Sequence, residues 1–293
     1  MITHEYYNLS HLGILSVTGD DAASFLQGQM TCSVYDVTDS QSRISAFCDP
    51  KGRVISTFFL VKNENGFLLI LPQALLTTVL NRLERYRLRA KVEIADVSEE
   101  MTLIGIRQKE TSLPFFDSHA LRTHREALIF IDLDVTKHRT LAIVPTHALN
   151  EHFPDCQIRS PQQWQLFDIE SAIPWLSTET SEEFIPQWLD LHHFNAISYT
   201  KGCYTGQEVI ARTHHLGKVV RSLAVLVCKT IVQIQPNCKI VNNLDDVAGN
   251  VLQFHHTDSK TMILAVIKVN KFSAHSHLDH SSKARLSIFM GLR

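Results

Sequence analysis

Short apolar runs rich in β-branched and aromatic residues alternate with polar turns along the first half of the chain. Such runs predict β-strands, at residues 14–18, 43–48, 53–62, 67–71, 91–97, 102–107, 127–133 and 140–144. The tetrapeptide Asn63-Glu64-Asn65-Gly66 between two of these runs is a turn signal. Residues 53–71 are therefore predicted to form a β-hairpin.

Two stretches show the spacing of a helix instead. Apolar residues recur three and four positions apart within residues 73–89, which predicts an amphipathic helix. Its last turns carry four arginines, which fit either a solvated helix C-terminus or a patch for RNA or an acidic ligand; they are Arg82, Arg85, Arg87 and Arg89. A shorter helix is expected from Asp20, whose side chain can cap it while Phe25 and Leu26 face inward.

The mixture lacks a regular strand–helix–strand rhythm, so it favours an α+β fold over a doubly wound sheet. The polar segment 111–125 contains Pro114 and is expected to separate two α+β units, at residues 1–110 and 111–221. Beyond residue 221 the pattern changes to strands joined by polar turns, at residues 223–228, 247–254, 262–269 and 285–289. This pattern predicts a small β-barrel or sandwich over residues 222–293.

Composition narrows the class of protein. A net charge of −2 and 44% hydrophobic residues are typical of a soluble globular protein without a broad nucleic-acid-binding surface. Six widely spaced cysteines without a Cys-x-x-Cys pair favour reduced thiols, and the opening MITHEYYNLSHLGIL lacks the pattern of a signal peptide. We therefore expect a cytoplasmic protein that does not associate with a membrane. The absence of a P-loop and of Gly-x-Gly-x-x-Gly argues against a nucleotide cofactor held by those motifs.

The stretch TKGCYTGQEVIART, residues 200–213, carries the first candidate chemistry. Gly202 and Gly206 flank Cys203, so the backbone there can take positive φ angles and approach a ligand closely. Lys201 can favour the thiolate form of Cys203. The alternative is a small buried cysteine that acts as a hydrophobic residue. Glu208 and Arg212 form either an ordinary i,i+4 helical pair or a ligand site in which the glutamate accepts ring N–H groups.

A second candidate lies upstream in QQWQLFDIESAIPW, which places Trp164, Asp168, Glu170 and Trp175 within one short segment. An indole can stack on a pterin ring, and a neighbouring carboxylate can accept its paired ring donors. A tryptophan packed in the core is the competing interpretation. The histidine-rich HSHLDH and the pair His255-His256 have zinc-ligand chemistry, but sixteen histidines make chance clusters expected. No metal site is predicted.

KGCYTGQEVIART resembles the signature of the YgfZ-type folate-binding family, which is related to the aminomethyltransferase (T-protein) of the glycine cleavage system. TGDDAASFLQGQMTCSV, FCDPKGRVIST, DIESAIPW and FIPQWLDLHHFNAISYTKGCYTGQE resemble further family blocks, from about residue 17 to 221. The resemblance implies two ferredoxin-like α+β units and a C-terminal β-barrel around a central folate pocket. It also implies tetrahydrofolate or a one-carbon derivative as cofactor, and iron–sulfur enzymes or cluster-assembly proteins as partners, including the enzyme that methylthiolates tRNA.

Family roles transfer residue by residue. The signature positions are Lys201, Gly202, Cys203, Tyr204, Gly206, Gln207, Glu208 and Arg212. The folate-binding residues implied are Trp164, Glu170, Tyr204, Glu208 and Arg212. Separately, the basic run ARTHHLGKVVR predicts that Arg212, Lys218 and Arg221 attract the anionic glutamate tail of the folate. The resemblance also implies that Cys203 is a functional thiol. Three roles remain open for it: a cluster or metal ligand, a redox thiol, or a contact to a client protein.

Two departures from the family pattern bear on function. Leu12 stands where some relatives place an aromatic residue, so stacking on the folate is expected from one side only. Leu71 and Pro72 stand where the transferases carry an Asn- or Asp-containing stretch, which leaves aminomethyl transfer without its base. An accessory protein is therefore favoured over the alternative, a turnover aminomethyltransferase or demethylase. Direct tRNA binding is not expected, because no interleaved aromatic and basic motif is present.

Overall fold

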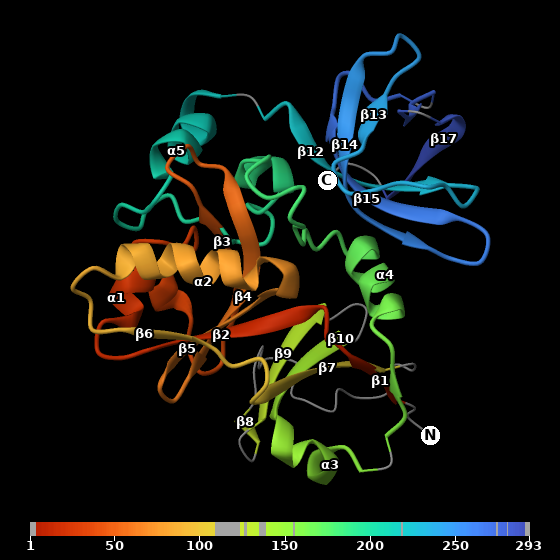
Figure 1. The fold of residues 1–293 in the computed structure, drawn as a ribbon. Coiled ribbons are helices and arrows are strands. Elements are labelled where there is room, and N and C mark those ends of the chain that lie inside the picture. The colour runs from red at the N-terminus through yellow and green to blue at the C-terminus, as the bar shows by residue number, and fades with distance from the viewer. Residues whose placement is uncertain are drawn as a thin grey trace. The chain divides into compact units, whose positions relative to one another are not determined.

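The structure is a computed structural model. It describes residues 4–108, 124–125, 128–134, 139–154, 156–217, 219–273, 275–279 and 281–290. The chain divides into two compact units, one formed by residues 1–45 and 58–164 and the other by residues 46–57 and 165–293. Figure 1 labels most of their helices and strands, and each unit is described by itself.

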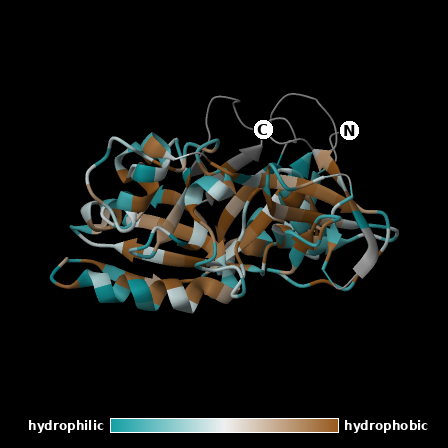
Figure 2. Ribbon diagram, turned by 90° about the horizontal axis from the view of Figure 1, so that it is seen from above, coloured by the Kyte–Doolittle hydropathy of each residue, from teal (hydrophilic) through white to brown (hydrophobic). Residues whose placement is uncertain are grey.

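A five-stranded sheet, most of it in the first unit, has the order β3-β4-β5-β2-β6. Its strands are β2 (Leu12–Thr18), β3 (Arg43–Cys48), β4 (Val54–Asn63), β5 (Gly66–Pro72) and β6 (Glu93–Asp96). The predicted hairpin is confirmed, because β4 and β5 pair antiparallel up to Asn63 opposite Gly66. Figure 2 shows hydrophobic residues concentrated along the strands of the molecule.

Helix α2 (Gln73–Arg87) confirms the predicted amphipathic helix. Its apolar stripe buries Leu75, Leu76, Val79 and Leu83 and packs against β2, β5 and β6. Helix α1 (Ala22–Gln27) buries Phe25 and Leu26 as expected. The cap predicted at Asp20 is wrong: the N-cap residue is Asp21, whose carboxylate accepts a hydrogen bond from the Lys91 backbone N–H rather than from the helix.

A six-stranded sheet in the first unit has the order β11-β1-β7-β10-β9-β8. Its strands are β1 (His4–Asn8), β7 (Met101–Gln108), β8 (His124–Arg125), β9 (Leu128–Asp134), β10 (Arg139–Pro145) and β11 (Ile158–Arg159). This sheet gathers strands from both sides of residue 110, because β1 and β10 both pair with β7. The separator expected at 111–125 falls largely outside the described residues, and the boundaries at 110 and 221 stay a prediction.

Short helices and a long irregular segment precede the barrel. They are η1 (Val34–Asp36), η2 (Thr146–Ala148), α3 (Leu149–His152), α4 (Gln162–Glu170), η3 (Pro186–Leu189) and α5 (Gln207–Leu216). Between α4 and η3 the chain is anchored to the β3–β4 hairpin, since the Val54 N–H donates to the Phe184 carbonyl and the Glu182 N–H donates to the Val54 carbonyl, both at 2.8 Å. No helix in the described part of the chain is both long and apolar enough to cross a membrane.

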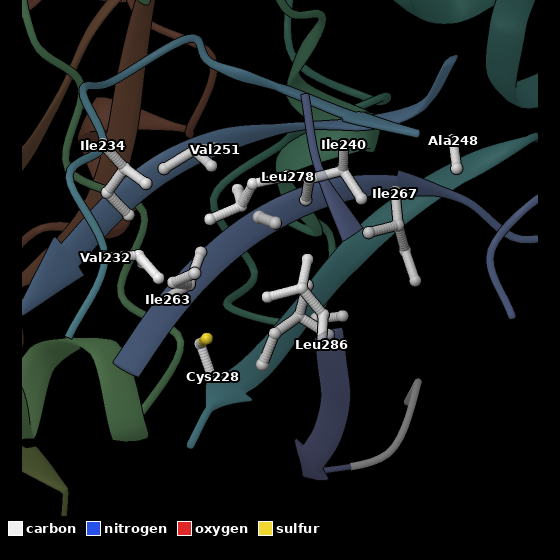
Figure 3. Close-up of a cluster of buried hydrophobic side chains, with 13 residues drawn as sticks. Cys228, Val232, Ile234, Ile240, Ala248, Val251, Ile263, Ile267, Leu278 and Leu286 are labelled. Carbon is white, nitrogen blue, oxygen red and sulfur yellow. The ribbon is translucent and has the colours of Figure 1, made fainter. Parts of the chain in front are cut away.

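The C-terminal strands close into a barrel in the order β12-β15-β14-β13-β16-β17. They are β12 (Arg221–Cys228), β13 (Lys239–Val241), β14 (Val247–His256), β15 (Thr261–Lys268), β16 (His277–Leu278) and β17 (Ser281–Met290). Alternate residues of β15, namely Ile263, Ala265 and Ile267, point into a core that is shown in Figure 3. The α+β class with a C-terminal β-barrel is thereby confirmed, and the sandwich alternative is wrong.

Candidate functional site

The turn between β3 and β4 contacts the signature segment at Gly206. One oxygen of the Asp49 carboxylate accepts hydrogen bonds from the backbone N–H groups of Lys51 and Arg53, both at 2.8 Å. Gly52 closes the turn with a φ of 71°, a left-handed conformation that favours glycine. Asp-Pro-Lys-Gly is thus a self-capped tight turn with a fixed shape.

Gly206 joins the signature to this turn. It is the N-cap of α5 with a φ of 83°, and a Cβ atom there would lie 2.6 Å from the Asp49 carbonyl oxygen and 2.9 Å from the Gly52 Cα. Only glycine fits so close to backbone. The expected positive φ is therefore confirmed for Gly206 but not for Gly202, which lies outside the left-handed region and has open space where a Cβ would point.

Cys203 is exposed, whereas Cys48 in β3 is fully buried. The small-buried-residue interpretation of Cys203 is therefore wrong, although its function stays a prediction. Lys201 directs its amine toward the Tyr204 ring, at 5.0 Å from the ring centroid. Burial, followed by the neighbouring Asp49 charge, raises the pKa of the Cys48 thiol well above its ordinary value, so Cys48 stays a protonated core residue.

Some buried polar atoms in the signature and in the segment that leads into it lack hydrogen-bond partners among the described residues. The Tyr204 hydroxyl, the Tyr199 hydroxyl and the Gln187 side-chain oxygen have no hydrogen-bond partner among the described residues. Burial raises the pKa of Tyr199, and the nearby Gln187 side chain lowers it in part. The two groups nevertheless do not meet the geometry of a hydrogen bond. The Gln187 amide nitrogen donates to the Ile210 carbonyl at 2.7 Å, which fixes this side chain. Such atoms mark places where water or a ligand hydrogen-bonds.

Two arginines of the second unit each lie over the ring of one tryptophan, Trp188. The guanidinium carbons of Arg53 and Arg221 lie 5.1 and 4.4 Å from the ring centroid of Trp188. Arg53 donates to the Glu183 carbonyl oxygen at 2.7 Å. Burial, and after it the charge of Arg53, lowers the pKa of Arg221. Neither guanidinium pairs with a carboxylate within the described ranges, so an anion that bound here would relieve their mutual repulsion.

The other predicted signature and tail residues have different environments. Arg212 and Glu208 are exposed on α5 and do not form the expected i,i+4 ion pair. Glu208 lies in the first turn of the helix, where the helix dipole favours a negative charge. Lys218 lies outside the described residues, and Gln207 begins α5.

Trp164 belongs to the first unit, on α4. Its ring is 1% exposed and packs on Gly105 of β7, where a Cβ atom would lie 2.5 Å from the indole. The Arg139 guanidinium lies 5.0 Å from the same ring. This burial fits the core-tryptophan interpretation, and stacking of a ligand on Trp164 stays a prediction. Glu170 ends α4 half-buried in the second unit.

Asp168, near Glu170 on α4, has a structural partner. Its buried carboxylate accepts a hydrogen bond from the Trp175 indole N–H at 3.0 Å. The carboxylate of Asp168 and the indole of Trp175 therefore contact each other within the segment itself.

Sequence reasoning missed Arg53, Trp188, Gln187 and Tyr199. Three of them lie in the stretch FIPQWLDLHHFNAISYT, which leads into the signature. The density of polar and aromatic residues in an irregular segment was the available signal.

Comparisons with known proteins agree with this architecture. The family model described as the GCVT N-terminal domain matches residues 5–107. A protein of Colwellia psychrerythraea named tRNA-modifying protein YgfZ is 31% identical over 274 residues, covering 89% of this chain and 84% of the relative. The chain belongs to the YgfZ family. A second member with that name, from Hamiltonella defensa, is 35% identical over 221 residues, covering 71% of this chain and 66% of the relative.

The fold extends to a solved structure. The crystal structure of the glycine cleavage system aminomethyltransferase T from Bartonella henselae superposes with a TM-score of 0.73, covering 97% of this YgfZ-family chain and 84% of the other. At 14% sequence identity the likeness establishes the fold alone.

Proposed function

We propose that this YgfZ-family protein acts in tRNA modification as a folate-binding accessory protein that maintains iron–sulfur enzymes, including the one that methylthiolates tRNA. The observation that carries the proposal is the family signature itself, with Cys203 exposed on a loop that Gly206 fixes against the Asp49–Gly52 turn. An exposed thiol on a rigid support suits a redox step, a cluster ligand or a contact to a client protein. Six free cysteines are in keeping with a cytoplasmic location.

Tetrahydrofolate or a one-carbon derivative is the proposed cofactor, with Glu170, Tyr204, Glu208 and Arg212 of the second unit as its contacts. Two observations support this choice beyond the fold shared with an aminomethyltransferase. Glu208 and Arg212 leave both charges without an ion-pair partner among the described residues. The buried Tyr204 hydroxyl has an unused hydrogen-bonding capacity that a polar ligand can satisfy.

The glutamate tail of the folate is proposed to meet Arg221. The two guanidinium groups around Trp188 are close enough for one to lower the pKa of the other. A carboxylate that binds near them accepts charge-assisted hydrogen bonds and offsets that repulsion. Aminomethyl transfer is not proposed, because buried Leu71 and Pro72 stand at the end of β5 and supply no base.

Complementation tests this function. In cells that lack their own protein, Cys203→Ser is expected to abolish the gain in methylthiolated tRNA that the wild-type chain restores, measured by mass spectrometry of digested tRNA. Cys238→Ser is the matched control, because a serine oxygen can still accept the hydrogen bond that the Cys238 sulfur receives from the Gln235 N–H. If the wild-type chain restores no methylthiolation, the proposed function fails. If Cys203→Ser complements as well as Cys238→Ser, the thiol has no part in it.

A further inference from the structure

Three potential metal ligands meet at the end of η3, just before the signature. Asp190, His192 and His193 each offer one ligand atom, and these atoms all lie within 4.8 Å of one another. Zinc binds imidazole nitrogen and carboxylate oxygen at about 2.0–2.2 Å, so the ligands of one ion stand roughly 3–4 Å apart. A small rotation of the side chains therefore brings all three to one ion.

The carboxylate is held in place by its surroundings. Asp190 is 7% exposed, and one of its oxygens accepts hydrogen bonds from the Ser222 hydroxyl at 2.6 Å and from the Leu223 backbone N–H at 3.0 Å. Its backbone has a φ of 50°, in the left-handed region that non-glycine residues rarely adopt. Hydrogen bonds to a ligating carboxylate are the outer-shell support that metal sites generally show.

The two histidines stand on an ordered turn yet face solvent. The His193 N–H donates to the Asp190 carbonyl at 3.0 Å, and the Ala196 N–H donates to the Leu191 carbonyl at 3.0 Å. Both imidazoles are exposed, and their ring centroids lie 4.1 Å apart. Exposed rings can rotate to share an ion that arrives from solvent, while the buried carboxylate stays fixed.

We propose that Asp190, His192 and His193 bind a divalent transition-metal ion of the zinc class. Two imidazoles and one carboxylate are a donor set for zinc and similar ions, and are unsuited to magnesium, which prefers oxygen ligands. Three protein ligands leave at least one coordination position open, as in catalytic rather than structural zinc sites. The site goes beyond the proposed function, because neither the folate contacts nor Cys203 takes part in it.

Zinc titration of the full-length chain under competition with a chelator tests the site. The wild-type chain is expected to bind one Zn²⁺ at this site, and Mg²⁺ in excess is expected to leave that binding unchanged. His192→Ala/His193→Ala should weaken it by more than about 100-fold, since even the loss of outer-shell support costs about 10–100-fold. His275→Ala/His277→Ala, a histidine pair in the barrel, is the matched control and should leave the affinity unchanged.

Two further variants separate ligation from folding. Asp190→Asn retains an oxygen for Ser222 and Leu223 but loses the negative charge, so the affinity should fall while the melting temperature changes little. Ser222→Ala should lower the affinity by about 10–100-fold through the carboxylate it orients. Cobalt serves as a spectroscopic probe, because thiolate ligation gives a strong near-ultraviolet charge-transfer band and ligation by nitrogen and oxygen does not.

Three results would overturn the site: no saturable zinc binding by the wild-type chain, equal affinity in the wild type and the His192/His193 variant, or a thiolate band with cobalt. None of them bears on folate binding or on complementation, so the proposed function is tested separately.

Discussion

The C-terminal barrel differs from the signature region, here defined as residues 49–53 and 184–221, in what its side chains bury. The barrel buries a continuous set of apolar side chains, including Leu226, Ile240 and Ile263. Among the described residues no barrel side chain leaves a buried polar atom unpaired. The described residues of the signature region leave three such atoms, on Gln187, Tyr199 and Tyr204, and two of its arginines lie over one indole.

The unpaired buried polar atoms indicate that the signature region is less favourable for folding stability than the barrel. An unpaired buried polar group costs about 1–3 kcal/mol, so three in one small region are a sizeable cost unless water or a ligand satisfies them. The barrel carries no comparable cost within the described residues. Local departures from well-satisfied packing are typical of functional sites, and we therefore assign a stabilising role to the barrel core and ligand chemistry to the signature region.

The largest effect is expected from the barrel core. Ile263→Ala removes a fully buried side chain and should lower the free energy of unfolding by about 2–5 kcal/mol. Cys203→Ala, at an exposed position, should change it by less than about 0.5 kcal/mol. Urea unfolding followed by circular dichroism measures both. Similar losses in the two variants would break the distinction between the regions.

The two signature glycines give the next largest difference. Gly206→Ala must adopt a φ of 83° and meet the Asp49 carbonyl oxygen, so the free energy of unfolding should fall by about 1–3 kcal/mol. Gly202→Ala finds open space and should be neutral within about 0.5 kcal/mol. Denaturant melts of the pair provide the test. A Gly202→Ala loss as large as that of Gly206→Ala would contradict the docking of α5 on the turn.

The smallest effect concerns the unpaired hydroxyl. Tyr204→Phe removes a buried polar atom without a partner and should raise the free energy of unfolding by up to about 1 kcal/mol. The same variant should bind tetrahydrofolate more weakly, if the ligand uses that hydroxyl. Differential scanning calorimetry with and without tetrahydrofolate reports both changes. Lower stability in the absence of ligand would mean that the hydroxyl is satisfied in the free protein.

Local elements of the fold could be predicted because their signals are local. The spacing of Leu75, Leu76 and Val79 marked α2, and Asn65-Gly66 marked the hairpin turn. The strand β1 was missed, because its five residues carry little pattern of their own and are ordered by pairing with β7 about a hundred positions away. Non-local pairing of this kind leaves no mark on a single window of sequence.

The motif at the candidate site could be predicted from the sequence, but the residues that surround it in the fold could not. The motif around Cys203 was recognisable, and the glycine at 206 followed from its turn. The grouping of Arg53, Trp188 and Arg221 could not be read from the sequence, since it joins three distant segments through tertiary packing. The Asp190, His192 and His193 group likewise depends on Ser222 from β12 to orient its carboxylate.

Calorimetric titration with tetrahydrofolate tests the central claim most directly. Trp164 is unsuited to this test, because removing a fully buried indole would also destabilise its unit. Glu208 is exposed, so Glu208→Gln should fold as the wild type does.

We predict saturable binding of one tetrahydrofolate per wild-type chain. Loss of a charged hydrogen bond, worth about 1.5–3 kcal/mol, should weaken it by about 10–100-fold in Glu208→Gln. Glu93→Gln, at another exposed glutamate, should bind as the wild type does. Absence of saturable binding by the wild-type chain, or equal affinity in Glu208→Gln, would contradict a folate site at the signature.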